Sequence, residues 1–223
     1  MKKEFYRRHL PHYHTPGQVY FVTWCLKESI PVKAIDDYSK KICDLKSKIE
    51  AFRKNEKAPE IIAQLEKEFF SLRKKYINAF NKILDNQKNP ETNLSNNNHI
   101  QTIKSALHFW NKNKINNIAF SIMPNHVHWV LETYEKDHEE RLIYLQDVLK
   151  SVKQFTAYQI NKVENKEGPL WHRESFDITI RDEAHLSRAI NYTLNNPVKA
   201  KLSNTWAEWP GNWCDSYYID YIF

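Results

Sequence analysis

Residues 117–132 read NIAFSIMPNHVHWVLE, two apolar and β-branched runs separated by a Pro-Asn pair. Such runs predict adjacent strands, and the Pro-Asn pair favours a tight connection between them. Alternate side chains of a strand share a face, so His126 and His128 should point one way. Val127 and Trp129 should then point the other way and pack under helices. We expect the histidine face to be left open.

Two histidines one residue apart on an open face suit a metal ion. Imidazole binds first-row divalent metals well, and neutral ligands leave the charge of the ion available to a phosphate oxygen. The pattern is short, however. By itself it also fits two partly buried, hydrogen-bonded histidines or a chance alternation.

Composition narrows the class of protein. The chain has 223 residues, 41% hydrophobic and 27% charged, with a net charge of +6, which is typical of a soluble globular protein that favours polyanions. Three dispersed cysteines predict reduced thiols and a cytoplasmic location. Only three glycines are present, which excludes a Gly-rich phosphate loop. No apolar run is long enough for a membrane span, so a membrane partner is not expected.

The other predicted elements place the two strands of residues 117–132 in a larger sheet. Residues 18–26, QVYFVTWCL, predict a buried strand, and 176–182 predict another. Residues 139–163 have helical periodicity, and Asp182 should cap a helix over 183–196 that Pro197 helps to stop. The order of elements predicts an α+β fold, an antiparallel sheet with helices packed on one face, of the ferredoxin-like type.

Residues 37–100 have a different character. Apolar residues recur every three or four positions amid Lys, Glu and Arg in two segments, which predicts two amphipathic helices in an antiparallel hairpin. A polar stretch, 87–99, follows as a loop. We therefore divide the chain into a catalytic domain, residues 1–36 and 101–223, and an inserted helical hairpin with its polar loop, 37–100.

A second pair of polar residues lies in the predicted helix 183–196. Tyr192 and Asn196 are four residues apart and share one helical face. An Asn side-chain oxygen can bind a hard cation, and the tyrosine could reach a phosphate beside it. Taken alone, the pair fits equally a packed tyrosine and a C-terminal helix cap.

Several segments together resemble a known family. They are RRHLPHYHTPGQVYFVTW (7–24), MPNHVHWVL (123–131), LWHRESFDITIRD (170–182), YTLNNPVKAKL (192–202) and WAEWP (206–210). Taken in order, they resemble the REP-associated tyrosine transposases, relatives of the single-tyrosine transposases of small insertion sequences. All of these belong to the class of His-hydrophobic-His nucleases.

The resemblance implies a function and a role for each residue. His126 and His128 correspond to paired ligands of a Mg²⁺ or Mn²⁺ ion, Asn196 to the third ligand, and Tyr192 to the nucleophile. The implied activity is DNA transposition through single-strand cleavage and strand transfer, with a 5′-phosphotyrosine intermediate. The implied partner is single-stranded DNA with a hairpin or palindromic repeat, which would place the protein at the nucleoid. Residues 37–100 depart from the family pattern and leave open whether the protein is a monomer or a homodimer.

Basic residues offer candidate DNA contacts. Basic side chains engage phosphates, and interleaved aromatics can stack on unpaired bases. The candidates are Lys2, Lys3, Arg7, Arg8, His9, Lys150, Lys153, Arg173 and Arg181. His172 is a possible neighbour of the site.

Three other functions compete with this one. They are a non-catalytic nucleic-acid-binding protein with the same fold, a metal-dependent phosphohydrolase that uses water, and a structural protein built on the helical hairpin. The last predicts that deleting residues 37–100 abolishes all function. We expect instead that the deletion spares cutting and changes association or DNA choice.

Overall fold

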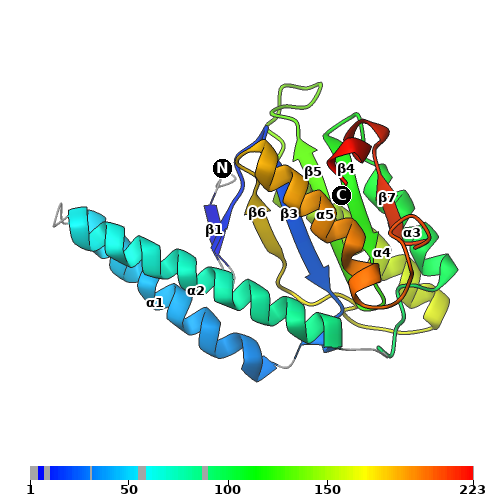
Figure 1. Cartoon of the computed structure of the whole chain (residues 1–223), viewed down its shortest axis with the longest axis horizontal. Coiled ribbons are helices and arrows are strands. Elements are labelled where there is room, and N and C mark those ends of the chain that lie inside the picture. The colour runs from blue at the N-terminus through cyan, green and yellow to red at the C-terminus, as the bar shows by residue number, and fades with distance from the viewer. Residues whose placement is uncertain (1–4, 8–10, 31, 55–58, 87–89, 223) are drawn as a thin grey trace.

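The structure is a computed structural model that describes residues 5–7, 11–30, 32–54, 59–86 and 90–222. Its centre is a five-stranded antiparallel sheet in the order β6-β3-β5-β4-β7 (Figure 1). The order of the first four strands is that of the ferredoxin-like split βαβ arrangement. The strands are β3 (Val19–Cys25), β4 (Ile115–Ile122), β5 (His126–Thr133), β6 (Phe176–Thr179) and β7 (Asn212–Cys214).

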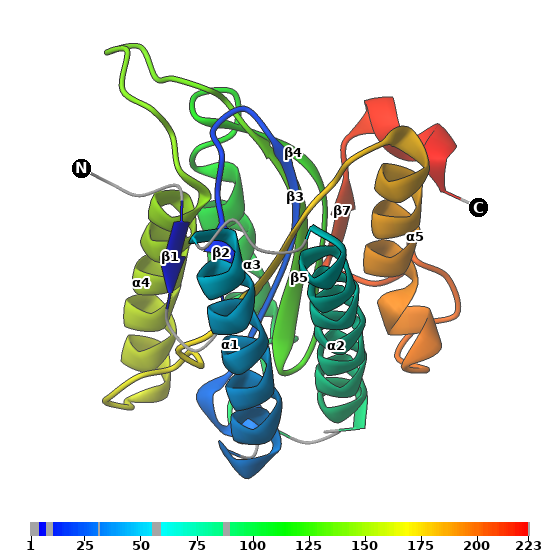
Figure 2. The ribbon, with the colours of Figure 1, turned by 90° about the vertical axis from the view of Figure 1, so that its left-hand side faces the viewer.

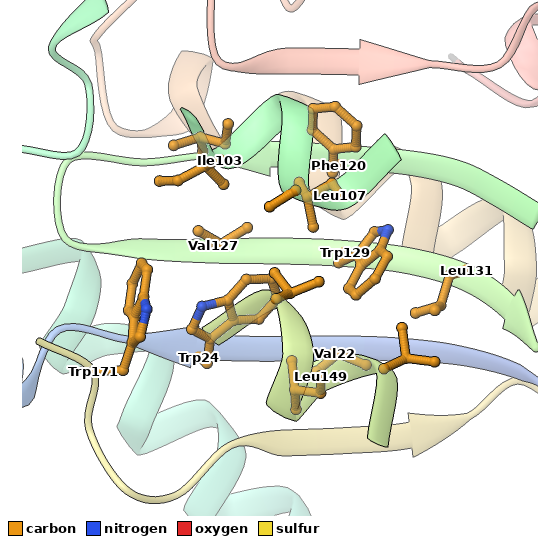
Figure 3. Close-up of a cluster of buried hydrophobic side chains, with 14 of the residues drawn as sticks. Val22, Trp24, Ile103, Leu107, Phe120, Val127, Trp129, Leu131, Leu149 and Trp171 are labelled. Atoms are coloured by element: carbon orange, nitrogen blue, oxygen red, sulfur yellow. The ribbon is translucent and has the colours of Figure 1, made fainter. Parts of the chain in front are cut away.

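One face of the sheet packs under two helices, α3 (Asn97–His108) and α4 (Leu145–Glu164). The side chains on this face include Trp24 of β3 and Trp129 of β5, whose rings meet edge to face at 6.1 Å between centroids. Figure 3 shows these tryptophans gathered with Val127 and other apolar residues beneath the helices. The prediction for the apolar face of β5 is confirmed.

The opposite face is also covered, by α5 (Glu183–Lys199) and by part of the helical hairpin (Figure 2). The α+β class and the antiparallel sheet are confirmed, but helices lie on both faces rather than on one. The reason is that this second face carries apolar residues too. Phe21 of β3 and Val130 of β5 pack with Ile190 of α5.

The hairpin consists of α1 (Val32–Lys54) and α2 (Pro59–Asn86), which lie side by side in Figure 1. It is anchored on the sheet: the ring of Phe80 in α2 lies 3.9 Å from that of Phe176 in β6, and Cys25 of β3 joins the same cluster. The first helix of the hairpin begins at Val32, before residue 37. The division of the chain into a catalytic domain and an insertion at residues 37–100 stays a proposal.

Two predicted helix boundaries differ from the structure. The helix expected from residue 139 begins at Leu145, because Asp137 Oδ1 accepts hydrogen bonds from the backbone N–H groups of Glu139, at 2.9 Å, and Arg141, at 3.0 Å, and so stabilises a turn. The last helix, α5, runs through Pro197 to Lys199 instead of stopping before the proline. A proline in a last turn removes only one helical hydrogen bond, which buried neighbours can offset.

The remaining elements are short. β1 (Phe5–Arg7) pairs with β2 (Pro11–Tyr13), and two 3-10 helices span Lys27–Ser29 and Ser216–Tyr221. The aromatic C-terminal segment, residues 206–222, packs on the body of the fold and adds β7 to the edge of the sheet beside β4. Among the residues that the structure describes, no helix has the length and apolar character needed to cross a membrane.

The cap of α5 sets the start of the helix that carries Tyr192 and Asn196. Asp182 Oδ1 accepts a hydrogen bond from the backbone N–H of His185 at 2.7 Å, as predicted for an N-cap. Asp182→Ala should lower the free energy of unfolding by about 1 kcal/mol, because this donor loses its partner. Urea denaturation measures the change. Asp182→Asn, which can still cap, should stay close to wild type, and an equal loss in both variants would contradict this role.

Candidate active site

His126 and His128 are the first and third residues of β5, and their side chains share one face of the sheet. Their Nε2 atoms lie 3.0 Å apart. The expectation of an open face is wrong: both side chains are only 1% exposed. The covering elements are α5, whose Asn196 the sequence brought to the histidines, and the end of α2, which the sequence did not place over this face.

The outer nitrogen of each imidazole has a fixed partner. His126 Nδ1 lies 2.6 Å from Asn125 Oδ1, and this oxygen can only accept, so Nδ1 carries the proton. The Nε2 of His126 therefore presents a lone pair. His128 Nδ1 lies 2.7 Å from the hydroxyl of Thr23, which can accept or donate, so His128 can also present its Nε2 lone pair.

Burial keeps both imidazoles neutral. It lowers the pKa of His126 to about 3. It also holds the pKa of His128 well below its ordinary value, with the neighbouring His126 acting in the same direction. Neutral imidazole is the form that binds metals, so no proton has to leave before these residues can act as ligands at neutral pH.

The helix α5 brings Asn196 and Tyr192 to the same place. Asn196 is 2% exposed, and its side-chain amide nitrogen lies 3.1 Å from His128 Nε2. The half-buried ring of Tyr192 lies edge to face with that of His128, with 5.2 Å between centroids. The two residues share a face of α5, as predicted, and the four candidate side chains converge.

The surroundings of Tyr192 favour the neutral phenol. Burial raises the pKa of Tyr192, and the carboxylate of Asp85 in α2 raises it further. Hydrogen bonding to the side chains of Asn196 and Asn81 acts in the opposite direction but does not reverse the shift. The Nζ atom of Lys199 lies 5.6 Å from the ring centroid of Tyr192.

The donor set fits a divalent cation. His128 Nε2 lies 3.0 Å from His126 Nε2 and 3.1 Å from the amide nitrogen of Asn196, so three side chains of metal-ligating type meet at His128. In the described part of the chain, no third histidine, cysteine or carboxylate joins the pair. The available protein ligands are therefore His126, His128 and Asn196.

Four of the other candidates line one groove between α4 and residues 169–175. Lys150, Lys153, His172 and Arg173 surround a cavity of about 590 Å³. The backbone N–H of His172 donates to the carbonyl oxygen of Cys25 at 2.8 Å, and Cys25 pairs with His126 across the sheet. The groove thus lies at the end of the sheet where β5 begins, on the side covered by α4, whereas the imidazoles face α5 and α2.

The remaining basic candidates are not brought to this groove. Arg181 lies beyond the other end of β6, 6.0 Å from the ring centroid of Phe70 in α2. Lys2, Lys3, Arg8 and His9 lie outside the described residues. Of Arg7 only the backbone, in β1, is described.

Sequence reasoning missed the residues that support this site. Thr23 is a polar residue in an otherwise apolar strand, and it lies opposite His128 in the β3–β5 register. Asn125 directly precedes the histidine pair, and both positions could have been noticed. The contacts of Asn81, Leu84 and Asp85 in α2 could not have been predicted. The periodicity of a helix does not show which residues its last turns contact.

Comparisons with known proteins bear on the family and on the fold. No protein-family model matches the chain. A Haemophilus influenzae protein named REP-associated tyrosine transposase is 28% identical over 97 residues, which are 42% of this chain and 55% of that protein. The chain resembles the REP-associated tyrosine transposases. It spans about half the length of this curated relative.

A solved structure shares the fold. It is that of a REP-associated tyrosine transposase bound to a REP hairpin, with a TM-score of 0.50 and 14% sequence identity. The match covers 95% of this chain and 82% of that one. It therefore includes most of the sheet and helices described above, and it supports the predicted fold class.

Burial of His126 should make the free energy of unfolding depend on pH. Its pKa is about 3 when folded and 6.5 ordinarily, so below pH 6.5 the unfolded chain binds a proton that the folded chain does not. Stability should therefore fall as the pH drops, by about 2 kcal/mol for this residue between pH 7 and pH 5. His126→Gln should reduce the pH 7 to pH 5 difference by that amount.

The measurement is urea denaturation at both pH values with a chelator present. The exposed His138 provides the control, since His138→Gln should keep the wild-type difference. A His126→Gln protein that loses as much stability as wild type between pH 7 and pH 5 would contradict the burial argument.

Proposed function

We propose that this protein cuts and rejoins single-stranded DNA, with Tyr192 as the nucleophile. The observation that carries the proposal is the meeting of four side chains, where Tyr192 and Asn196 from α5 contact the imidazole of His128, which in turn contacts that of His126. The resemblance to REP-associated tyrosine transposases supports the same reaction.

His126, His128 and Asn196 would hold a Mg²⁺ or Mn²⁺ ion. When bound, this ion supplies positive charge beside the scissile phosphate, where negative charge grows during the reaction. The hydrogen bond from His126 Nδ1 to Asn125 Oδ1 keeps that imidazole oriented. Burial of the imidazoles excludes water and keeps both rings neutral.

The Tyr192 hydroxyl would attack the phosphorus and displace the 3′ oxygen of the preceding nucleotide. A 5′-phosphotyrosine forms, the bond from phosphorus to the 3′ oxygen breaks, and the phenolic proton balances the new 3′-hydroxyl. Attack by another 3′-hydroxyl would then release Tyr192 and join the strands. The covalent link conserves the bond energy, so neither water nor ATP is consumed.

The DNA partner would be a strand that folds into a hairpin at a palindromic repeat. The solved relative is bound to a REP hairpin. In this chain, the groove with Lys150, Lys153 and Arg173 offers positive charge at the end of the sheet where β5 begins, on the side that α4 covers. The backbone carbonyl of His172 accepts a hydrogen bond from Lys153 Nζ at 2.9 Å, which holds that ammonium group at the groove wall.

The rival functions leave part of this arrangement unexplained. A non-catalytic DNA-binding protein has no use for a tyrosine and an asparagine aimed at two neutral imidazoles. A phosphohydrolase that activates water needs no tyrosine 5.2 Å from a metal-ligating ring. A structural protein built on the hairpin would not need the site at all.

Tyr192→Phe should abolish covalent capture of DNA, because the variant keeps the ring but lacks the attacking oxygen. The assay incubates the protein with a hairpin-bearing single strand and Mn²⁺, then separates protein–DNA adducts by denaturing electrophoresis. The adduct should fall by at least about 10³-fold, as expected when a nucleophile is removed. Tyr158→Phe, at an exposed tyrosine of α4, should keep the wild-type yield. Nicking by Tyr192→Phe would reject this nucleophile.

DNA binding should weaken steeply with salt. With about four phosphate contacts to a single strand, raising salt from 50 to 200 mM should lower the affinity about 50-fold. Replacing both Lys150 and Arg173 by Ala should remove two contacts and reduce that loss to about 7-fold. Fluorescence anisotropy with a labelled hairpin strand measures both. An unchanged salt dependence in the double variant would place the DNA outside this groove.

A further inference from the structure

The last turns of α2 contact the candidate site. The backbone carbonyl of Leu84 accepts a hydrogen bond from Asn125 Nδ2 at 3.0 Å. One turn earlier, Asn81 forms a hydrogen bond with Tyr192, and Asp85 acts on the same phenol through its charge. These residues belong to the helical hairpin that departs from the family pattern. The hairpin therefore reaches both the imidazoles and the tyrosine.

Asn125 connects α2 to His126. Its side chain is 2% exposed, with the amide nitrogen on the Leu84 carbonyl and the amide oxygen 2.6 Å from His126 Nδ1. Its backbone is also fixed, since the Asn125 carbonyl accepts from the N–H of Leu26 at 2.9 Å. The side chain thus spans from the helix to the imidazole.

The Leu84 carbonyl selects one orientation of this amide. With the nitrogen on that carbonyl, the oxygen faces His126 and accepts from its Nδ1–H. In the reversed orientation, two oxygens would oppose each other at Leu84, and the amide N–H would face His126 Nδ1, which would favour the Nε2–H form of the imidazole. Buried polar groups without partners are costly, so the reversed state is disfavoured. The carbonyl of a helix thereby decides which nitrogen of His126 carries the proton.

We propose that Asn125, oriented by the Leu84 carbonyl, is a positioning residue that keeps the Nε2 lone pair of His126 directed at His128, and that the hairpin is part of the active-site support. This rests on the proposed function, in which His126 is a metal ligand. Outer partners of ligating histidines fix the tautomer and strengthen metal binding. Our expectation that residues 37–100 could be deleted without affecting cutting takes no account of these contacts.

The test compares full-length variants in two measurements besides activity. NMR of ¹⁵N-labelled, metal-free protein identifies the protonated nitrogen of His126, and electron paramagnetic resonance titration gives the Mn²⁺ affinity. Wild type should show the Nδ1–H form. Asn125→Leu, which has a similar shape but no acceptor, should lose this form and bind Mn²⁺ about 10- to 100-fold more weakly. Asn125→Asp keeps an acceptor beside Nδ1 and should restore the Nδ1–H form.

A second pair of variants isolates the contribution of α2. Asp85 is exposed, and Asp85→Pro moves the preceding residue out of helical geometry and so turns the Leu84 carbonyl away. Asp85→Ala removes the same carboxylate but keeps the helix. Both variants lose the carboxylate, so only the proline variant should shift the tautomer of His126, and it should bind Mn²⁺ more weakly than the alanine variant. This pair keeps the test decisive even where Asn125→Leu fails to fold.

The outcomes separate this inference from the proposed function. If wild type forms a DNA adduct while Asn125→Leu and Asp85→Pro keep the wild-type tautomer and Mn²⁺ affinity, the positioning role is overturned. If wild type forms no adduct but the tautomer and Mn²⁺ affinity change as expected, the role of Asn125 holds and the reaction assigned to Tyr192 fails.

Discussion

The approach of two imidazole nitrogens to 3.0 Å on one face of β5 is the constraint on which the site depends. Two lone pairs cannot lie so close in a buried place unless something positive or a proton lies between them. The surrounding structure enforces this contact from both sides. Thr23 holds one ring from β3, Asn125 holds the other from the β4–β5 connection, and burial keeps both rings neutral.

The sheet makes this enforcement possible because it is buried on both faces. On one side, the tryptophan-rich cluster under α3 and α4 fixes the strands and therefore the spacing of alternate side chains. On the other side, α5 and α2 close over the polar residues and remove them from water. A one-sided fold would fix the same two histidines but leave them hydrated, with ordinary protonation near neutral pH.

The sequence predicts the parts of the site that follow from periodicity. Alternation along a strand placed His126 with His128, and the four-residue spacing on a helix placed Tyr192 with Asn196. It could not predict burial of the histidine face, because that depends on where a hairpin distant in sequence docks. For the same reason Asn81 and Leu84 were missed. The sequence also predicted that Pro197 helps to stop the last helix. The helix α5 instead continues to Lys199, because packing around its last turn offsets the hydrogen bond that the proline removes.

One consequence follows from Tyr192 and Asn196 lying a single turn apart on α5. A rigid helix cannot move one of these residues without the other. If the phenol swung outward to deliver a bound strand elsewhere, the carboxamide would leave the imidazoles in the same motion. Cutting and rejoining would therefore have to take place while α5 stays packed against the imidazoles. Exchange of strands would then require the DNA to move rather than the helix.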